Sequence, residues 1–252
     1  MRTGPAALIV VLAPVICAAA DLRSESAHEL VKQFRDTPIF WRQFEVGKSI
    51  VALEDRSALP DLVGYLTAED RHERANAAFV FASLGDRRGL EVLEAILADR
   101  DDRPDAQGIA GFGSGIAPAN ANPTQRIEGP RHTKQQIESD RYYAAHVLGE
   151  LRDPRAVPAL ISVLNEPNIN LAAVWSLAEI GDHRAVSPLI SLLSSEDPTV
   201  RVIAIRALEK LQAKEAIPAL YRLLDDKDRS HVDDLIPVAD AAKQALGRLG
   251  AH

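Results

Sequence analysis

A histidine–glutamate pair, His72-Glu73, is the part of this 252-residue sequence that comes nearest to the ligand set of a metal enzyme. Imidazole and carboxylate groups bind first-row metals, but a dimetal site draws several of them from different helices. The equivalent positions of the later helical segments read Ser139-Asp140, Asn168-Ile169, Thr199-Val200 and Pro237-Val238. Because one pair cannot build such a site, we predict no metal ligands. We expect Glu73 to favour the positive end of its helix and His72 to be solvated.

No other pattern points to catalysis. The glycine-rich run from Gly108 to Gly115 lacks the preceding strand and the Lys-Ser/Thr of a phosphate-binding loop. The histidines His132, His183, His231 and His252 are scattered, without the spacing of metal ligands. A nucleophile-elbow motif is also absent. The sequence therefore predicts a protein that is not an enzyme, with no catalytic residues and no cofactor.

Repeated helix pairs are the elements that would have to position any site. Four junctions read alike, namely Leu53-Glu54-Asp55-Arg56, Leu84-Gly85-Asp86-Arg87, Leu151-Arg152-Asp153-Pro154 and Ile180-Gly181-Asp182-His183. Alanine recurs seven residues before the closing aliphatic residue of the second helices, at Ala77, Ala144, Ala173, Ala204 and Ala242. The junction aspartates lie 31 and 29 residues apart, which is the length of one helix pair. A single pair cannot bury its apolar face, so this period predicts stacked pairs.

The repeats predict an all-α fold, a right-handed α-solenoid of about six helix pairs. First helices are expected to begin near Leu22, Arg56, Arg87, Pro154, His183 and Lys214, and second helices to end at Leu53, Leu84, Leu151, Ile180, Leu211 and Leu249. Asp70, Asp153 and Asp182 suit helix caps. Residues 21–55 are predicted to form a capping pair and residues 56–252 the repeats. A Gly-, Pro- and Asn-rich segment, 101–136, is predicted to be a flexible insertion.

The first twenty residues have the layout of a secretory signal peptide. Arg2 precedes an apolar run from Ala6 to Val15, and Ala18-Ala19-Ala20 fits the small-x-small cleavage pattern. The run is too short for a membrane span. Two alternatives stay open: a buried N-terminal helix, and a lipoprotein acylated at Cys17, although Ile16 before it is not small. We expect an exported protein, either periplasmic or secreted.

Charge and cysteine content exclude several functions for the mature chain. Loss of Arg2 from 29 basic residues leaves 28 against 36 acidic residues, a net charge of −8 that disfavours nucleic acid as a partner. Loss of Cys17 leaves no thiol, which suits an oxidising compartment and excludes disulfides and thiolate metal sites. No later stretch is long and apolar enough to span a membrane.

The run from Gly181 to Leu193, followed by Asp197-Pro198-Thr199-Val200-Arg201, resembles the HEAT-like repeats of the phycobilisome-lyase type. The resemblance covers Arg56 to Leu249 outside the insertions and implies an armadillo-like α/α superhelix. Such repeats serve scaffolds, lyases and a hydroxylase alike. Asp70 with Arg74 and Asp197 with Arg201 resemble the aspartate–arginine ladder of HEAT repeats, and we expect them to form i,i+4 pairs.

One face of the second helices carries apolar residues where water is expected. The position five residues before each closing aliphatic residue lies about 150° from the core stripe and should face the concave surface. It reads Phe79, His146, Trp175, Arg206 and Gln244, and the position four residues earlier includes Tyr142. Exposed aromatic residues mark interaction sites. We predict a binding site of Phe79, Tyr142, His146, Trp175 and Arg206, with segment 101–136 as its lid; the alternative is that the insertion or the curvature buries these residues.

Together these features predict an exported scaffold or binding module that recognises a protein or peptide partner on its concave face. Two alternatives remain open. One is a metal-dependent oxidoreductase, because the HEAT-repeat enzyme deoxyhypusine hydroxylase binds two irons through His-Glu pairs. The other is a chromophore-lyase-like protein that binds a tetrapyrrole. The identity of the partner and the oligomeric state are left open by the sequence.

Overall fold

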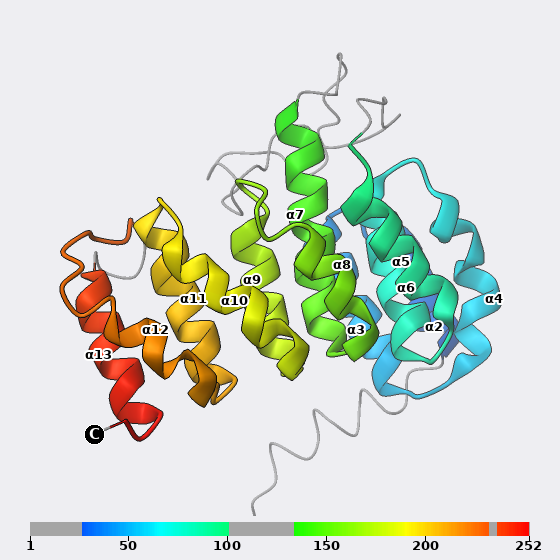
Figure 1. Ribbon diagram of the computed structural model, residues 1–252. Coiled ribbons are helices and arrows are strands. Elements are labelled where there is room, and N and C mark those ends of the chain that lie inside the picture. Colours follow the sequence, from blue (N-terminus) through cyan, green and yellow to red (C-terminus); the bar gives the residue numbers. More distant parts are fainter. Residues whose placement is uncertain (1–26, 101–133, 232–235, 252) are drawn as a thin grey trace, which may run out of the picture.

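The computed structural model describes residues 27–100, 134–231 and 236–251, which form one row of stacked helix pairs (Figure 1). The first helices are α2 (Ala27–Asp36), α4 (Leu59–Leu62) continued by the 3-10 helix η2 (Val63–Thr67), α6 (Arg87–Ala98), α8 (Val157–Ser162), α10 (Val186–Ser191) and α12 (Ile217–Tyr221). The second helices are α3 (Phe40–Ala52), α5 (Arg71–Ser83), α7 (Lys134–Leu151), α9 (Asn170–Ile180), α11 (Pro198–Lys210) and α13 (Val238–Arg248). Each second helix packs against the next, so these helices form a layer of their own. The predicted all-α solenoid of six helix pairs is confirmed.

Aspartate side chains start the helices where the sequence predicted caps. Asp70 Oδ1 accepts a hydrogen bond from the His72 amide at 2.7 Å, and Asp182 Oδ1 accepts one from the Arg184 amide at 2.8 Å. Asp153 caps η3 (Pro154–Ala156) in the same way. Each cap satisfies an amide that has no partner inside its helix, which stabilises the helix start by about 1 kcal/mol.

The second helices end within one residue of the predicted positions. Each closing aliphatic residue is followed by a residue in the left-handed region, namely Glu54, Gly85, Arg152, Gly181, Gln212 and Gly250, with φ between 51° and 80°. This conformation stops the helical ladder and turns the chain towards the next pair. Gly85 and Gly181 adopt it without steric cost, whereas a residue with a Cβ loses about 1 kcal/mol there.

The recurring alanines lie where the helices come closest. Ala77, Ala144, Ala173, Ala204 and Ala242 are all 0% exposed. The approach is closest at two glycines of neighbouring helices. A Cβ on Gly89 of α6 would lie 2.1 Å from the Ala78 carbonyl oxygen of α5, and one on Gly149 of α7 would lie 2.5 Å from Ser176 Oγ of α9. Small side chains therefore set the spacing within and between the pairs.

Some predictions fall on residues outside the described ranges. They are the signal peptide, residues 1–20, and nearly all of the insertion, residues 101–136. Helix α7 begins at Lys134, two residues before the predicted end of that insertion. Within the described ranges the only strand-like feature is an isolated bridge between Arg229 and Pro237. None of the helices described here combines the length and the apolar character needed to cross a bilayer.

The layer of second helices lies on the inside of the curve. Phe40 of α3 reaches across α5 to Tyr143 of α7, with ring centroids 5.1 Å apart. Lys48 of α3 likewise lies 3.7 Å from a carboxylate oxygen of Glu150 of α7. Helices α3 and α7 both contact α5. Their side chains can also touch each other only if the layer of second helices curves and brings them together over α5. The concave surface is therefore closed over α5.

Replacing Gly89 by alanine tests the close approach of α5 and α6. The added Cβ would lie against the backbone of Ala78 and Ala82, which cannot rotate away. We expect Gly89→Ala to lower the free energy of unfolding by about 2 kcal/mol or more, measured by urea denaturation. Gly247→Ala is the matched control, because a Cβ on this helical glycine meets nothing within 4 Å. That change should stabilise the protein by about 0.5 kcal/mol, and equal effects of the two changes would contradict the packing described.

Candidate functional site

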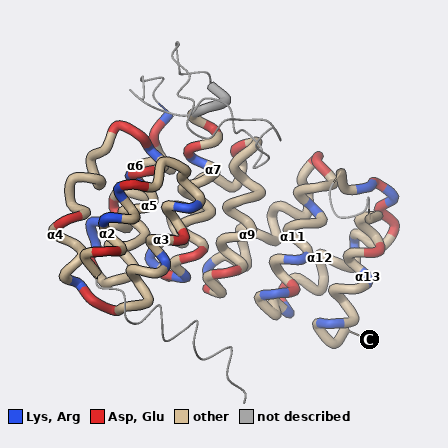
Figure 2. Tube along the Cα trace, turned by 180° about the vertical axis from the view of Figure 1, so that it is seen from behind, with Lys and Arg blue, Asp and Glu red and all other residues tan. Residues whose placement is uncertain are grey.

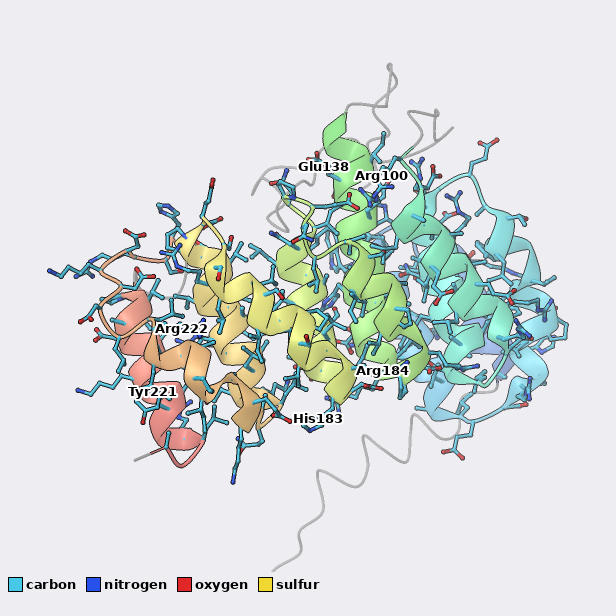
Figure 3. All side chains as sticks on the ribbon, viewed as in Figure 1. Arg100, Glu138, His183, Arg184, Tyr221 and Arg222 are labelled. Atoms are coloured by element: carbon cyan, nitrogen blue, oxygen red, sulfur yellow. The ribbon has the colours of Figure 1, made fainter. Side chains whose placement is uncertain are left out.

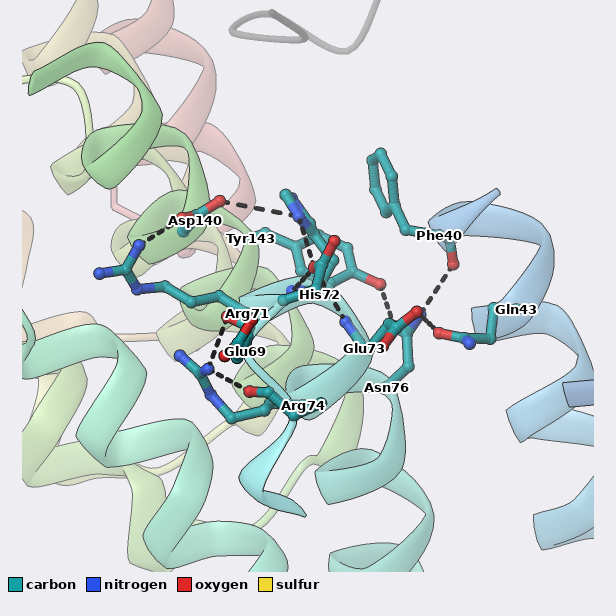
Figure 4. A network of polar contacts seen from close by, with 12 residues as sticks. Phe40, Gln43, Glu69, Arg71, His72, Glu73, Arg74, Asn76, Asp140 and Tyr143 are labelled. Atoms are coloured by element: carbon teal, nitrogen blue, oxygen red, sulfur yellow. Dashed lines mark hydrogen bonds and ion pairs between the residues drawn. The ribbon is translucent and has the colours of Figure 1, made fainter. Parts of the chain in front are cut away.

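A buried ion pair ties the start of α5 to α7 (Figure 4). Arg71, which is 3% exposed, donates from Nη1 to Asp140 Oδ2 at 3.1 Å, and Asp140 is 1% exposed. The other terminal nitrogen of Arg71 lies 3.4 Å from Asp99 Oδ2, at the end of α6. A buried charge that loses its partner costs several kcal/mol, so these three groups must stay together. Sequence reasoning missed the pair because its members lie 69 residues apart.

His72 lies beside this ion pair and is largely enclosed. Its Nδ1 atom lies 3.6 Å from Asp70 Oδ1 and 3.6 Å from Asp140 Oδ1. Its ring contacts Phe40 and Tyr143, with centroid distances of 4.4 Å and 5.0 Å. The side chain is only 15% exposed, so the prediction of a solvated His72 is wrong. The aromatic residues of α3 and α7 that close over α5 cover it.

The carboxyl group of Asp70 remains ionised beside His72. Burial favours the neutral acid, but the contacts with His72 and the amides of His72 and Glu73 outweigh it and lower the pKa of Asp70. The prediction for Glu73 fits this arrangement, because Glu73 lies in the first turn of α5. Asp70 therefore caps the start of α5, and the Glu73 carboxylate lies close to the positive end of the helix dipole.

A chain of hydrogen bonds joins four helices next to His72, and Figure 4 shows its links among α7, α5 and α3. The Tyr143 hydroxyl of α7 donates to Asn76 Oδ1 of α5. The Asn76 amide donates to Gln43 Oε1 at 2.8 Å and to the Phe40 carbonyl at 2.9 Å. Gln43 Nε2 in turn donates to the Phe34 carbonyl of α2 at 3.1 Å. Burial raises the pKa of Tyr143, so its hydroxyl keeps the proton that this chain requires.

One predicted site residue is buried where α3 and α7 close over α5. We call this part of the concave surface its closed half. Phe79 is 6% exposed, and its ring lies 4.7 Å from that of Phe44 of α3, centroid to centroid. The prediction that Phe79 belongs to an exposed binding stripe is therefore wrong. The physical reason is the curvature, because α3 and α7 close over α5 and cover the face that was expected to meet solvent. The alternative of burial by curvature holds at this position.

The other predicted residues lie beyond the closed half, on α7, α9 and α11. Tyr142 is 44% exposed and Trp175 is 43% exposed. The side chain of His146 is 56% exposed and lies 3.9 Å from Glu150, while Arg206 is half-buried. We call the surface formed by Tyr142, His146, Trp175 and Arg206 the open concave face. It keeps two large aromatic side chains, Tyr142 and Trp175, in contact with water.

Ion pairs link the C-terminal ends of second helices, where Figure 2 shows basic and acidic residues close together. They are Lys48 with Glu150, Arg152 with Glu179, Lys210 with Glu179 and Arg248 with Glu209. The hydrogen bond from Lys210 is the largest of the interactions that lower the pKa of Glu179. Exposed pairs of this kind contribute little stability each. Their regular placement leaves alternating charge along this edge of the array.

The predicted i,i+4 pairing of aspartate with arginine is wrong for Asp197 and Arg201. The Arg201 guanidinium donates to the Ser195 carbonyl at 2.6 Å and lies 3.0 Å from Asp226 Oδ2, in the next repeat. Asp197 instead caps α11 through the Thr199 amide at 2.7 Å. Asp197 and Arg201 therefore have different partners, because the Asp197 side chain already accepts a hydrogen bond from a backbone amide as the N-cap.

Arginines at the equivalent position of two other repeats also bind backbone carbonyls. Arg74 donates to the carbonyl of Glu69 at 2.9 Å. Arg141 donates to the Leu97 carbonyl at 2.6 Å and to Glu166 Oε2 at 2.8 Å. Hydrogen bonding to Arg141 is the largest cause of the lowered pKa of Glu166. These arginines fix the loops between the layers and are structural.

A hollow of about 520 Å³ lies beside the loop that precedes α9. Its charged side chains pair within the site: Arg100 and Arg141 both contact Glu166, and Glu138 accepts from Asn168 at 3.0 Å. Figure 3 shows Arg100 and Glu138 near the N-terminal end of α7. In the described part of the chain, no three His, Cys, Asp or Glu side chains are grouped to hold a metal. The open concave face therefore remains the candidate site.

Comparison with known proteins places the repeats in a wider group. The HEAT-repeat family matches residues 134–193, 165–236 and 186–251. A phycocyanobilin lyase subunit alpha from Picosynechococcus sp. is 36% identical over 135 residues, which cover 46% of this chain and 50% of that protein. The bilin biosynthesis protein PecE from Mastigocladus laminosus is 46% identical over 87 residues, covering 33% of this chain and 32% of its own length. This chain thus spans half or less of these curated relatives.

Among solved structures, a chain from the complex of CpcE and CpcF of phycocyanin lyase from Nostoc sp. is similar to this one. It is 23% identical with a TM-score of 0.48, over 77% of this chain and 65% of that chain. The relatives correct one sequence-based prediction. Two of them are named for a lyase and for bilin biosynthesis, so the prediction that the chain is not an enzyme is wrong.

Removing one hydroxyl tests the buried hydrogen-bond chain. Tyr143→Phe leaves Asn76 Oδ1 without its donor inside the protein. We expect the free energy of unfolding to fall by about 1–3 kcal/mol in urea denaturation. The neighbouring change Tyr142→Phe is the control, because Tyr142 is 44% exposed. Its effect should stay within about 0.5 kcal/mol; a Tyr143→Phe protein as stable as this control would show that the chain does not hold the helices.

Proposed function

Because this chain belongs to the HEAT-like repeat proteins of the phycobilisome-lyase type, we propose that it binds a bilin on its open concave face as one subunit of a bilin lyase. The observation that carries the proposal is the pair of exposed aromatic side chains, Tyr142 and Trp175, on adjacent helices of the inner layer. Flat conjugated ring systems stack on such side chains. The names of the relatives supply the chemical class of the ligand.

The surroundings of the two aromatic residues suit a linear tetrapyrrole. Its pyrrole rings are apolar and planar, while its propionate groups are anionic. Trp175 offers an exposed ring on α9, and the half-buried Arg206 lies on the next second helix, α11. Planar guanidinium groups favour carboxylates. His146 on α7 adds a polar group that can donate or accept a hydrogen bond.

A protein partner is part of the proposal. One relative is named as a subunit, and this chain spans only half of that relative. The open concave face or an edge of the array would contact the partner. The sequence favoured a protein or peptide as the ligand of the open concave face. This is the weaker hypothesis, because the relatives are named for bilins.

Export is proposed on the layout of residues 1–20 alone. Intact mass spectrometry of the protein from its native host should give a chain that begins at Asp21. A mass that includes Met1 would contradict export by this route. A chain that begins at Cys17 with added acyl mass would instead indicate a lipoprotein.

A bilin titration tests the proposed ligand. Adding phycocyanobilin to the purified chain should shift its visible absorption band as the ligand is ordered. Trp175→Ala should weaken binding by about 30-fold. It should change the melting temperature little, because Trp175 is 43% exposed and its removal opens no cavity.

Trp41→Ala is the matched control for this experiment. Trp41 is 44% exposed, but it lies on α3, at the opposite end of the layer of second helices from the open concave face. We expect its loss to leave bilin affinity unchanged. Equal weakening by both substitutions, or no spectral change with the unmodified chain, would remove the open concave face as the bilin site.

A further inference from the structure

The hollow near the N-terminal end of α7 contains a buried guanidinium nitrogen that lacks an acceptor. Arg141 lines this hollow and is 4% exposed. Its Nε atom donates to the Leu97 carbonyl, and its Nη1 atom donates to Glu166 Oε2. Its Nη2 atom is buried and has no hydrogen-bond partner in the part of the chain that the structure describes. A buried donor without an acceptor is unfavourable, so a ligand that brings an acceptor to this nitrogen gains binding energy.

The equivalent arginine of a later repeat shows which group fits this nitrogen. Arg201 occupies the same position in its helix, ten residues before the closing leucine. Its Nη2 atom donates to Asp228 Oδ2 at 2.7 Å and to Asp226 Oδ1 at 3.3 Å. Two carboxylates therefore satisfy at Arg201 the nitrogen that has no partner at Arg141. Guanidinium groups also match carboxylates in shape and charge.

The charges around the hollow favour a ligand with a single negative charge. Glu166 pairs with both Arg141 and Arg100, so these three side chains together carry one positive charge in excess. Glu138 also lines the hollow, where its carboxylate accepts a hydrogen bond from Asn168 at 3.0 Å. Its negative charge opposes a second anionic charge on the ligand. A monocarboxylate is therefore better matched to this hollow than a phosphate dianion.

The apolar part of the wall is aliphatic. Ile137 of α7 and Ile169, which precedes α9, line the hollow together with Pro167. None of the described lining residues is aromatic. The volume of about 520 Å³ lies within the range of small-molecule sites. The hollow thus offers space for an aliphatic chain beside the group that Arg141 would bind.

We propose that this hollow, which we call the Arg141 site, binds an aliphatic monocarboxylate. The carboxylate accepts a hydrogen bond from Arg141 Nη2, and the carbon chain lies against Ile137 and Ile169. The proposal does not rest on the bilin, because no residue of the open concave face lines the Arg141 site. Trp175→Ala should therefore leave the affinity for the carboxylate unchanged, so the two proposals can fail separately.

Hexanoate is a suitable probe for the Arg141 site. Titration of the full chain, followed by saturation-transfer NMR of the ligand, should give a dissociation constant of about 1 mM, as expected for so small a molecule. Hexanamide has the same carbon chain without the charge and should bind about tenfold more weakly. Equal affinity for the two probes, no binding of hexanoate at about 10 mM, or tighter binding of inorganic phosphate would overturn the proposal.

Two substitutions with opposite expected effects separate ligand recognition from stability. Arg141→Lys keeps a cation but removes Nη2, and it should weaken hexanoate binding by about tenfold or more. Glu138→Gln removes the opposing charge and keeps an oxygen that can accept from Asn168, so it should strengthen binding by about fivefold. A variant that merely folds poorly cannot bind more tightly. Unchanged or weaker binding by Glu138→Gln would contradict the proposed site.

A pair of exposed arginines supplies the matched control. Arg100, whose side chain is 64% exposed, pairs with Glu166 in the hollow, and Arg87, at 80%, pairs with Glu91 on α6. Arg100→Ala leaves the charge of Glu166 offset by Arg141 alone and should weaken hexanoate binding by about fivefold. Arg87→Ala removes a similar pair outside the hollow and should have no effect. Equal effects of the two changes would show that hexanoate does not bind at the Arg141 site.

Discussion

The hydrogen-bond chain from Tyr143 through Asn76 to Gln43 fixes how the first three second helices fit together. A buried side-chain amide without partners costs a large part of a domain's net stability, so Asn76 permits only the arrangement that satisfies it. That arrangement places a hydroxyl from α7 and an amide from α3 on either side of α5. The ion pair of Arg71 with Asp140 adds a second tie between α5 and α7. The curvature of the N-terminal half follows from these ties.

The curvature divides one continuous layer into two parts with different properties. Over α5 the aromatic side chains of α3 and α7 meet each other and exclude water, and there they act as packing. Tyr142 of α7 and Trp175 of α9 instead remain in contact with solvent. The same type of residue, at the same repeat position, is core in one half and surface in the other.

This division also explains why the repeat sequence says little about activity. The caps, the alanines and the closing residues specify the stacking, and a stacked array serves many functions. What distinguishes this chain are the side chains on its open concave face and the relatives that its repeats match, which are named for bilin chemistry. The lone His72-Glu73 pair belongs to the structural part, since His72 is enclosed between Phe40 and Tyr143 and Asp140 lies beside it.

The sequence by itself determined the features that depend on near neighbours. Caps such as Asp153, left-handed closing residues such as Gly181 and buried alanines such as Ala173 are specified within one helix pair, so their periodicity revealed the fold and the ends of the helices. The tertiary structure alone decided which residues of the predicted stripe meet water. Phe79 is buried by helices far from it in the sequence, and Asp140 pairs with Arg71 across 69 residues. The physical reason is that helical periodicity gives the direction of a side chain from its own helix, whereas burial depends on the angles between helices, which distant polar contacts set.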